Sequence, residues 1–188
     1  MWARFSATLW LANFRLSLRD EFVTLRHRVM AFESLTDERI GQLLLMPKRV
    51  SNPTARNVTD ANHDKREYIV ESVDGGERFR LFVRQNKTIG DDFSCGLQWL
   101  PAGGEELILA RYNGSSHSHP NRLEGNRLEF VCHIHRTTER YIQANRKPDG
   151  FAEAAAFYQT CNGALHRLMV DCNIAGLEAE PDHPELFQ

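Results

Sequence analysis

The feature that most constrains the fold is a series of alternating apolar and polar runs, separated by tight turns, that begins at residue 66. "REYIVESV" and "RFRLFVRQ" flank "DGG", while "FSCGLQWL" and "ELILARYN" flank "PAGG". Alternation places successive side chains on opposite faces of a strand, and Asp-Gly between two such runs is typical of a β-hairpin. "RLEFVCHIH" predicts a fifth strand, and "RYIQA" is the candidate for a sixth. Because the connections are short, we expect a mainly antiparallel sheet over residues 66–144.

Helical patterns precede this region. Over residues 1–46, apolar side chains recur every three or four positions, which lines one face of a helix. Ser34, with Asp37 three residues later, resembles a capping box for a second helix, and Pro47 ends the pattern. Residues 47–65 are polar and rich in Asn, Thr and Pro, which predicts a loop.

A long C-terminal helix is predicted at residues 150–174. There "FAEAAAFYQTCNGALHRLMVDCNI" repeats apolar residues at helical spacing, and Asp149 can cap its start. The expected fold class is therefore α+β: a mainly antiparallel β-sheet of five to six strands, flanked by N-terminal helices and one long C-terminal helix. With 188 residues, of which 41% are hydrophobic, the chain is expected to form a single domain over 1–188.

Composition excludes several classes of protein. A net charge of −2 argues against a strongly basic, histone-like nucleic-acid binder. No apolar run approaches the roughly 20 residues of a membrane-spanning helix, so no membrane partner is expected. The cysteines lie far apart and form no C-x-x-C motif, which predicts reduced thiols and a cytoplasmic protein.

Four of the eight histidines lie within the 19 residues "HSHPNRLEGNRLEFVCHIH". His133 and His135 are two positions apart in a predicted strand, so both imidazoles should project from the same face. His117 and His119 lie in the turn-rich segment before that strand. If "ELILARYN" pairs with "RLEFVCHIH", this segment can fold back and bring the second pair to the first.

One interpretation of these histidines is a metal site, because two H-x-H pairs offer up to four imidazoles to Zn, Fe, Mn, Ni or Cu. Glu124 follows His119 by five residues, a spacing similar to the H-x-H…E ligand run of cupins. The flanking glycines and the later histidine of the cupin pattern do not match this sequence.

A second interpretation is metal-free acid–base cleavage of a phosphodiester, in which one neutral and one protonated histidine move the protons. Residues 111–147 contain seven basic and three acidic residues, a net charge of +4, while the rest of the chain carries −6. Such asymmetry favours an anionic ligand. "HRT" at 135–137 matches one H-x-T element of two-histidine phosphoesterases, and the second element is absent from the sequence.

The third interpretation is binding without chemistry, of a nucleic acid, a nucleotide or an acidic partner. Tyr112 and Tyr141 could then stack on bases. A structural role for the histidines, with hydrogen bonds inside the fold, stands beside this interpretation.

The run "FSCGLQWL…LILARYNGSSHSHPN…FVCHIHRTTERY" resembles a family of bacterial proteins encoded on mobile or accessory gene segments. The resemblance covers about residues 78–175, and its motifs are an R-Y-N-G turn, a histidine-containing loop and a later H-I-H strand. This family has no established activity, so the resemblance implies no catalytic role. It implies only that the positions such proteins mark are occupied here by His117, His119, Asn121, His133 and His135.

We therefore expect a phosphoester hydrolase of the nuclease type that acts on RNA, DNA or a nucleotide, with or without a divalent transition metal (Zn, Mn, Fe or Ni). The alternatives are an anionic-ligand binding protein without catalysis and a cupin-like metal enzyme. The catalytic candidates, which are also the candidate metal ligands, are His117, His119, His133 and His135. The candidate ligand-binding residues are Arg111, Tyr112, Asn121, Arg136, Arg140 and Tyr141.

Overall fold

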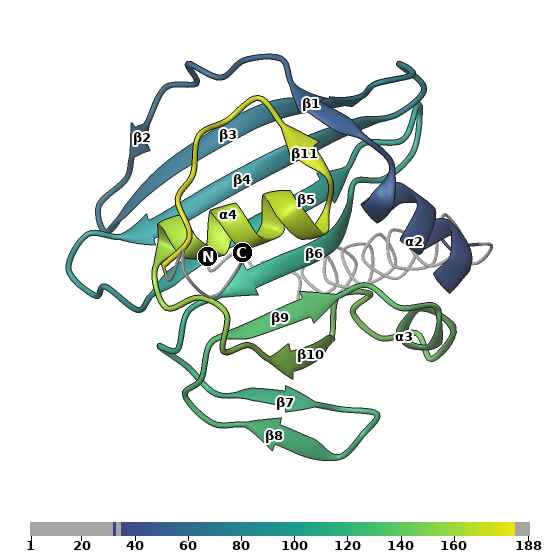
Figure 1. Ribbon diagram of the computed structural model, residues 1–188. Helices are drawn as coiled ribbons and strands as arrows, with labels where there is room; N and C mark the ends of the chain where they lie inside the picture. Colours follow the sequence, from purple (N-terminus) through teal and green to yellow (C-terminus); the bar gives the residue numbers. More distant parts are fainter. Residues whose placement is uncertain (1–31, 33–34, 183–188) are drawn as a thin grey trace, which may run out of the picture. The chain divides into compact units, whose positions relative to one another are not determined.

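A computed structural model describes Phe32 and residues 35–182 (Figure 1). The chain divides into two compact units, residues 1–34 and 35–188, and the description below concerns the second. The first predicted helix, before residue 34, lies outside the described residues. The second predicted helix is present at Asp37–Leu45, but Thr36 rather than Ser34 is its N-cap, because the Thr36 hydroxyl accepts a hydrogen bond from the Arg39 N–H. The single domain over 1–188 stays a prediction.

The second unit is built on a nine-stranded sheet with the order β10-β9-β6-β5-β4-β3-β1-β11, in which β2 also pairs with β3. Neighbouring strands are antiparallel, except that β1 and β11 are parallel. A separate two-stranded hairpin, β7 with β8, lies below β10 in Figure 1. The strands are β1 Lys48–Val50, β2 Val58–Thr59, β3 His63–Ser72, β4 Arg78–Asn86, β5 Phe93–Trp99, β6 Leu107–Asn113, β7 His119–Asn121, β8 Asn126–Leu128, β9 His133–Arg136, β10 Phe151–Ala154 and β11 Ile174–Ala175.

The two hairpins predicted from their turns are confirmed. β3 pairs with β4 across "DGG", where Gly75 has a φ of +74°, and β5 pairs with β6 across "PAGG", where Gly103 has a φ of +71°. Glycine adopts these backbone angles without the steric cost that a Cβ atom brings. The antiparallel pairing of β6 with β9, on which convergence of the histidines depends, is also present.

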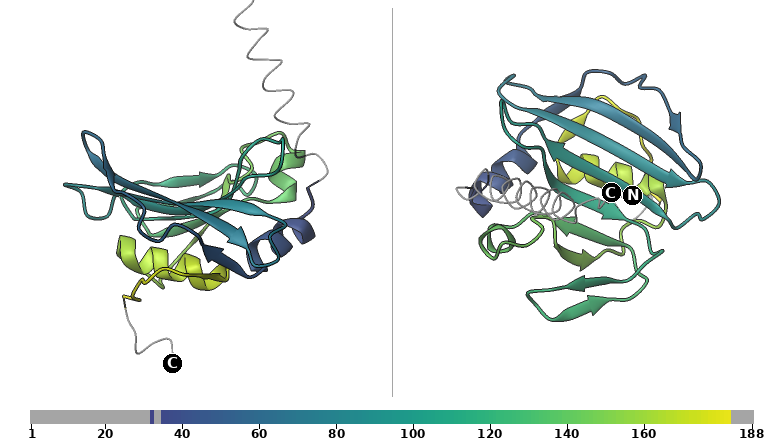
Figure 2. Two further views of the ribbon diagram at one scale, coloured as in Figure 1. Left: turned by 90° about the horizontal axis from the view of Figure 1, so that it is seen from above. Right: turned by 180° about the vertical axis from the view of Figure 1, so that it is seen from behind.

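Three helices are described: α2 Asp37–Leu45, α3 Glu139–Gln143 and α4 Cys161–Asp171. Helix α4 packs across β4, β5 and β6 on one side of the sheet, as Figure 2 shows. We call this side the helix face; it buries apolar side chains such as Leu81, Leu97 and Leu168. The opposite side, which α4 does not cover, we call the open face. No helix in residues 35–182 is long and apolar enough to cross a membrane.

The expected fold class was wrong. The described chain is mostly β, its sheet has nine strands rather than five or six, and it has no long C-terminal helix. Residues 150–174 instead contain β10, a connection and the 11-residue α4, and the next strand, β11, begins at Ile174. The "RYIQA" segment forms α3 instead of a strand, and the 47–65 segment contains β1, β2 and the start of β3.

Tertiary contacts explain the loss of the long helix. The alanine-rich segment after Gly150 pairs with the edge of β9, and the backbone N–H and C=O of Ala152 both bond to the Asn121 side chain. Thr160 then starts α4, because its hydroxyl accepts a hydrogen bond from the Gly163 N–H. Local helix propensity is weak enough for such contacts to override it.

A buried lysine joins the ends of two helices. Lys48 is 1% exposed, and its ammonium donates to the carbonyls of Leu44, Met46 and Cys172 at 2.7–2.9 Å. These carbonyls lie at the C-terminal ends of α2 and α4, where a cation also meets the negative end of each helix dipole. Burial lowers the pKa of Lys48 to about 8.

Candidate functional site

The site lies on the open face, where β6 and β9 run side by side. Arg111 on β6 is directly opposite His135 on β9, and Asn113 is opposite His133. Side chains alternate along each strand, so these four share the open face, whereas the residues between them point toward α4. The prediction that His133 and His135 project together is confirmed.

The other two histidines lie at the start of β7: His117 precedes the strand and His119 is its first residue. The ring centre of His119 is 4.4 Å from that of His135 and 5.8 Å from that of His133, and the ring centre of His117 is 5.1 Å from that of His133. The His133 and His135 rings are 5.0 Å apart. We call these four residues the histidine cluster. The predicted fold-back of the first H-x-H pair onto the second is present.

Backbone carbonyls fix the tautomers of three rings. His133 Nδ1 lies 2.7 Å from the Val131 carbonyl, and His135 Nδ1 lies 3.0 Å from the Asp149 carbonyl. His119 Nε2 lies 2.9 Å from the Gly150 carbonyl. A carbonyl only accepts hydrogen bonds, so each of these nitrogens carries the proton. The remaining nitrogens, His133 Nε2, His135 Nε2 and His119 Nδ1, therefore carry lone pairs.

Burial keeps these imidazoles neutral. His133 is 0% exposed and His135 is 2% exposed. Burial lowers the pKa of His133 to about 4 and that of His135 to about 2, and it also lowers the pKa of His119. The nearby Arg111 guanidinium adds to the effect on His135, because a second positive charge there is unfavourable. Near neutral pH, all three are lone-pair donors rather than acids.

Three buried atoms in this region make no hydrogen bond with any described residue: His135 Nε2, Arg111 Nε and Asp149 Oδ2, of which the last has only an ion pair with Arg111. Leaving a buried polar atom without a partner costs about 1–3 kcal/mol. The Arg111 guanidinium also forms an ion pair with Asp149, at 3.1 Å, and Lys147 lies 3.2 Å from the same carboxylate. His135 Nε2 is therefore a hydrogen-bond acceptor without a donor, and Arg111 Nε is a donor without an acceptor, on the same buried part of the open face.

The described part of the chain contains no group of three or more His, Cys, Asp or Glu side chains already arranged to hold a metal ion. The distances between ring centres in the histidine cluster are nevertheless close to those of imidazoles that bind one metal ion. Imidazoles arranged tetrahedrally around one zinc ion have ring centres about 5 Å apart. Glu124, the candidate cupin-like carboxylate, is engaged elsewhere: it accepts a hydrogen bond from Tyr141 at 2.7 Å and pairs with Arg140 at 2.6 Å.

Two predicted ligand-binding residues are not brought to the cluster. Tyr112 is fully buried on the helix face, where its hydroxyl donates to Asp171 of α4 at 2.7 Å. Arg136 projects to the same face, because it alternates with His135 along β9, and its charge acts on Tyr112 and Cys172. Neither residue can stack on a base or hold a phosphate at the open face.

Three other predicted ligand-binding residues have structural partners. Asn121 is buried, and both polar ends of its side chain bond the backbone of Ala152, which attaches the β7–β8 hairpin to β10. Tyr141 is 1% exposed and bonded to Glu124. Arg140 pairs with Glu124 and stacks over the Phe151 ring at 4.6 Å. Arg111 alone among the predicted cations reaches the histidines.

Sequence reasoning missed several residues of the site. Asp149 was expected to cap a helix; instead its carbonyl orients His135 and its carboxylate pairs with Arg111. The Asn113 amide nitrogen lies 3.4 Å from His133 Nε2, and the Asn113 amide oxygen accepts a hydrogen bond from the Ser94 hydroxyl. No sequence signal identified these residues, because each becomes relevant only through contacts that form in the folded chain.

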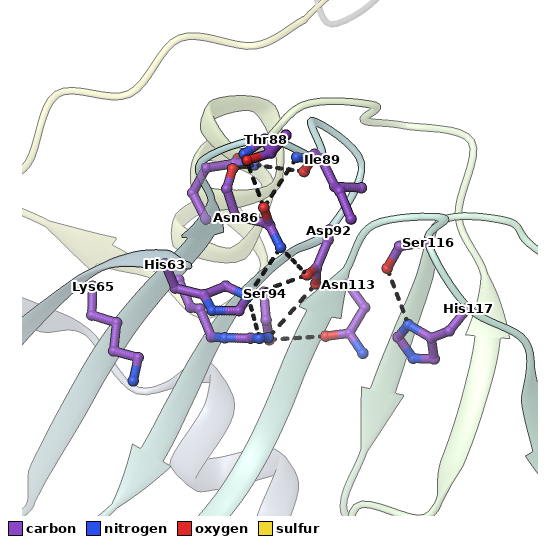
Figure 3. Close-up of polar contacts among 12 residues, drawn as sticks. His63, Lys65, Asn86, Thr88, Ile89, Asp92, Ser94, Asn113, Ser116 and His117 are labelled. Carbon is purple, nitrogen blue, oxygen red and sulfur yellow. Dashed lines mark hydrogen bonds and ion pairs between the residues drawn. The ribbon is translucent and has the colours of Figure 1, made fainter. Parts of the chain in front are cut away.

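Polar contacts extend along the open face beyond the cluster. Figure 3 shows Asn113 and Ser94 lying between His117 on one side and a second polar group on the other. In that second group, the Asp92 carboxylate lies 3.2 Å from His63 Nε2 and accepts a hydrogen bond from Asn86 at 2.9 Å. Polar side chains of β4, β5 and β6 therefore continue from the cluster along the open face.

No protein-family model matches this sequence, and the searches of curated proteins and of solved structures returned no significant match.

Proposed function

We propose that the histidine cluster binds one divalent transition-metal ion of the zinc class and that this centre hydrolyses a phosphoester. The observation that carries the proposal is the lone pair of His135 Nε2. It is buried and without a described partner, and the Asp149 carbonyl holds its ring in the tautomer that a metal ligand requires.

The ligand set we propose is His119, His133 and His135. Each has one nitrogen bonded to a backbone carbonyl, the arrangement that commonly orients metal-bound histidines, and each has the other nitrogen as a lone-pair donor. The ligand atoms do not already converge, so metal binding would require the segment that carries His119 to move. His117 is exposed at the edge of the cluster and leaves a side open to solvent. Catalytic zinc sites typically have three protein ligands and one open position.

The metal-free alternative is less well supported by the same geometry. A general acid must hold a proton near neutral pH, but the pKa of His133 is about 4 and that of His135 is about 2. Both rings are also almost completely buried, so a polynucleotide could not contact them directly. A metal ion is small enough to occupy such a position.

The choice of a phosphoester rests on charge. The segment 111–147 has a net charge of +4, and its Arg127, Arg140 and Lys147 side chains are more than half exposed, although each also pairs with a carboxylate. Exposed cations of this kind attract an anionic substrate, such as a nucleotide or a nucleic acid. When bound, a zinc-class ion lowers the pKa of a coordinated water and polarises a phosphoryl oxygen.

Metal analysis of the full chain tests this proposal. Wild-type protein, stripped and then reconstituted with Zn²⁺, should retain about one ion per chain. His135→Gln should lose it, while His166→Gln, which alters a histidine on α4, should not. Co²⁺ titration of the wild type should give the visible absorption of a tetrahedral nitrogen site, a result that does not depend on any variant folding.

Hydrolysis is measured separately, with bis(p-nitrophenyl) phosphate and a labelled oligonucleotide. Cleavage that requires the added ion and disappears in His135→Gln supports the whole proposal. Stoichiometric metal without cleavage refutes the hydrolytic function and leaves a metal-binding protein. Absence of both metal and Co²⁺ absorption refutes the site itself, and an ordered water would then partner His135 Nε2 and Arg111 Nε.

A further inference from the structure

Two thiols from distant parts of the chain lie together on the helix face. Cys95 is in the middle of β5 and Cys161 is the first residue of α4, and their sulfur atoms are 3.8 Å apart. A disulfide places its sulfurs about 2.05 Å apart, so the pair needs an approach of less than about 2 Å. Cys132 and Cys172 have no such contact among the described residues.

The two thiols differ in access. Cys95 is completely buried, whereas Cys161 is half-buried and borders a cavity of about 280 Å³. Polar side chains that line this cavity include Asp64, Arg66, Gln85 and Asn162. A small polar oxidant can therefore reach Cys161 but not Cys95.

The surroundings of Cys161 favour its thiolate. The Cys95 S–H can donate to the Cys161 sulfur, and Arg66 lines the same cavity; both lower the pKa of Cys161. The start of α4 adds the positive end of a helix dipole. The hydrogen bond to Cys161 and burial both raise the pKa of Cys95, which stays protonated.

We propose that Cys161 is a peroxide-reactive thiol and that Cys95 is its resolving partner, so that a hydroperoxide converts the pair into a disulfide. This inference is independent of the histidine cluster, which lies on the other face of the sheet.

The chemistry balances in two steps. The Cys161 thiolate attacks one oxygen of hydrogen peroxide, so that an S–O bond forms, the O–O bond breaks and hydroxide leaves to become water with one proton. The Cys95 sulfur then attacks the Cys161 sulfur, an S–S bond forms, and the hydroxyl leaves as a second water with the Cys95 proton. The two thiols lose two electrons, and the peroxide gains them.

The product would tie the first turn of α4 to the centre of the sheet. β5 is covered by α4 and is paired on both sides, so the new bond would join the two layers of the core. Oxidation should therefore make the start of α4 harder to open.

The test uses the full chain at neutral pH, with chelator present so that no bound metal contributes to oxidation. One equivalent of hydrogen peroxide is added, and peptide mass spectrometry locates the products. We expect a Cys95–Cys161 disulfide, formed about 10-fold faster than any oxidation of the half-buried Cys132. The Cys132→Ser variant is the matched control and should behave as the wild type.

Two variants separate the roles. Cys161→Ser should leave Cys95 reduced, whereas Cys95→Ala should stop at a Cys161 sulfenic acid that dimedone traps. Circular dichroism checks that both are folded, and the wild-type peptide map gives a result that needs no variant. Preferential oxidation of Cys132, or a wild-type Cys161 that proceeds to sulfinic acid without linking to Cys95, would overturn the proposal.

Discussion

The two buried histidines of β9 should make the metal-free protein sensitive to acid. In the unfolded chain, a histidine takes up its proton near pH 6.5, whereas native His133 does so only near pH 4 and native His135 only near pH 2. Between these values the unfolded state binds more protons than the native state. Lowering the pH therefore favours unfolding, and the stability present above pH 6.5 is lost progressively down to each native pKa.

The size of the effect follows from the two shifts. Each histidine contributes about 1.4 kcal/mol per pH unit within its window. At about pH 4.5, two units below the unfolded value, the loss is about 2.7 kcal/mol for each residue and about 5 kcal/mol for the pair. Since domains of this kind are stable by about 5–15 kcal/mol, the effect alone should bring the protein close to unfolding.

Urea denaturation in the presence of chelator measures this effect, with the free energy of unfolding determined at several values between about pH 7 and pH 4.5. His135→Gln removes one titrating group, so its pH slope should be smaller by about 1.4 kcal/mol per unit. His166→Gln on α4 is the matched control for the loss of a histidine outside the cluster, and its slope is compared with that of His135→Gln. If His135→Gln loses stability with acid as steeply as the wild type, the burial argument for neutral histidines is wrong.

Three further substitutions test the fold. Lys48→Met should lower the free energy of unfolding, measured by urea denaturation, by about 2–4 kcal/mol, because three carbonyls at the ends of α2 and α4 lose a charged hydrogen-bond donor. Asn121→Ala should cost about 1–3 kcal/mol and speed hydrogen exchange in β7 and β8, because both bonds to Ala152 are lost; unchanged exchange would contradict this. Gly96→Ala should lower the thermal midpoint, because a Cβ atom there would lie 2.3 Å from the Phe82 ring and cost about 1–3 kcal/mol; an unchanged midpoint would show that the ring moves freely.

Local sequence rules were sufficient where the structure depends on near neighbours. Asp-Gly-Gly and Ala-Gly-Gly turns identified two hairpins, and the two-residue spacing of His133 and His135 placed both on one face. The same alternation separates Arg111 from Tyr112, since adjacent strand residues cannot both face one site. Naming both as ligand residues therefore went beyond what the rule allows.

Other features depend on contacts far along the chain and could not be predicted locally. Nothing near Glu124 shows that it will pair with Arg140, and nothing near Asp149 shows that its carbonyl will meet His135. The alanine-rich segment after Gly150 has good helix propensity, yet it becomes β10 because β9 offers an unpaired edge. The histidines were found from composition, but their neutral state follows only from burial.

The parallel pairing of β1 with β11 has a consequence for the order of events during synthesis. β1 ends at Val50 and β11 ends at Ala175, so one edge of the sheet stays incomplete until the ribosome has added the intervening residues. At translation rates of about 5–20 residues per second, this takes on the order of 10 s. The hydrogen bond from the Lys48 ammonium to the Cys172 carbonyl can form only after the same interval. A nascent chain of this protein therefore exposes an unpaired strand edge throughout that interval, a period in which chaperone binding or pairing with a second nascent chain would compete with folding.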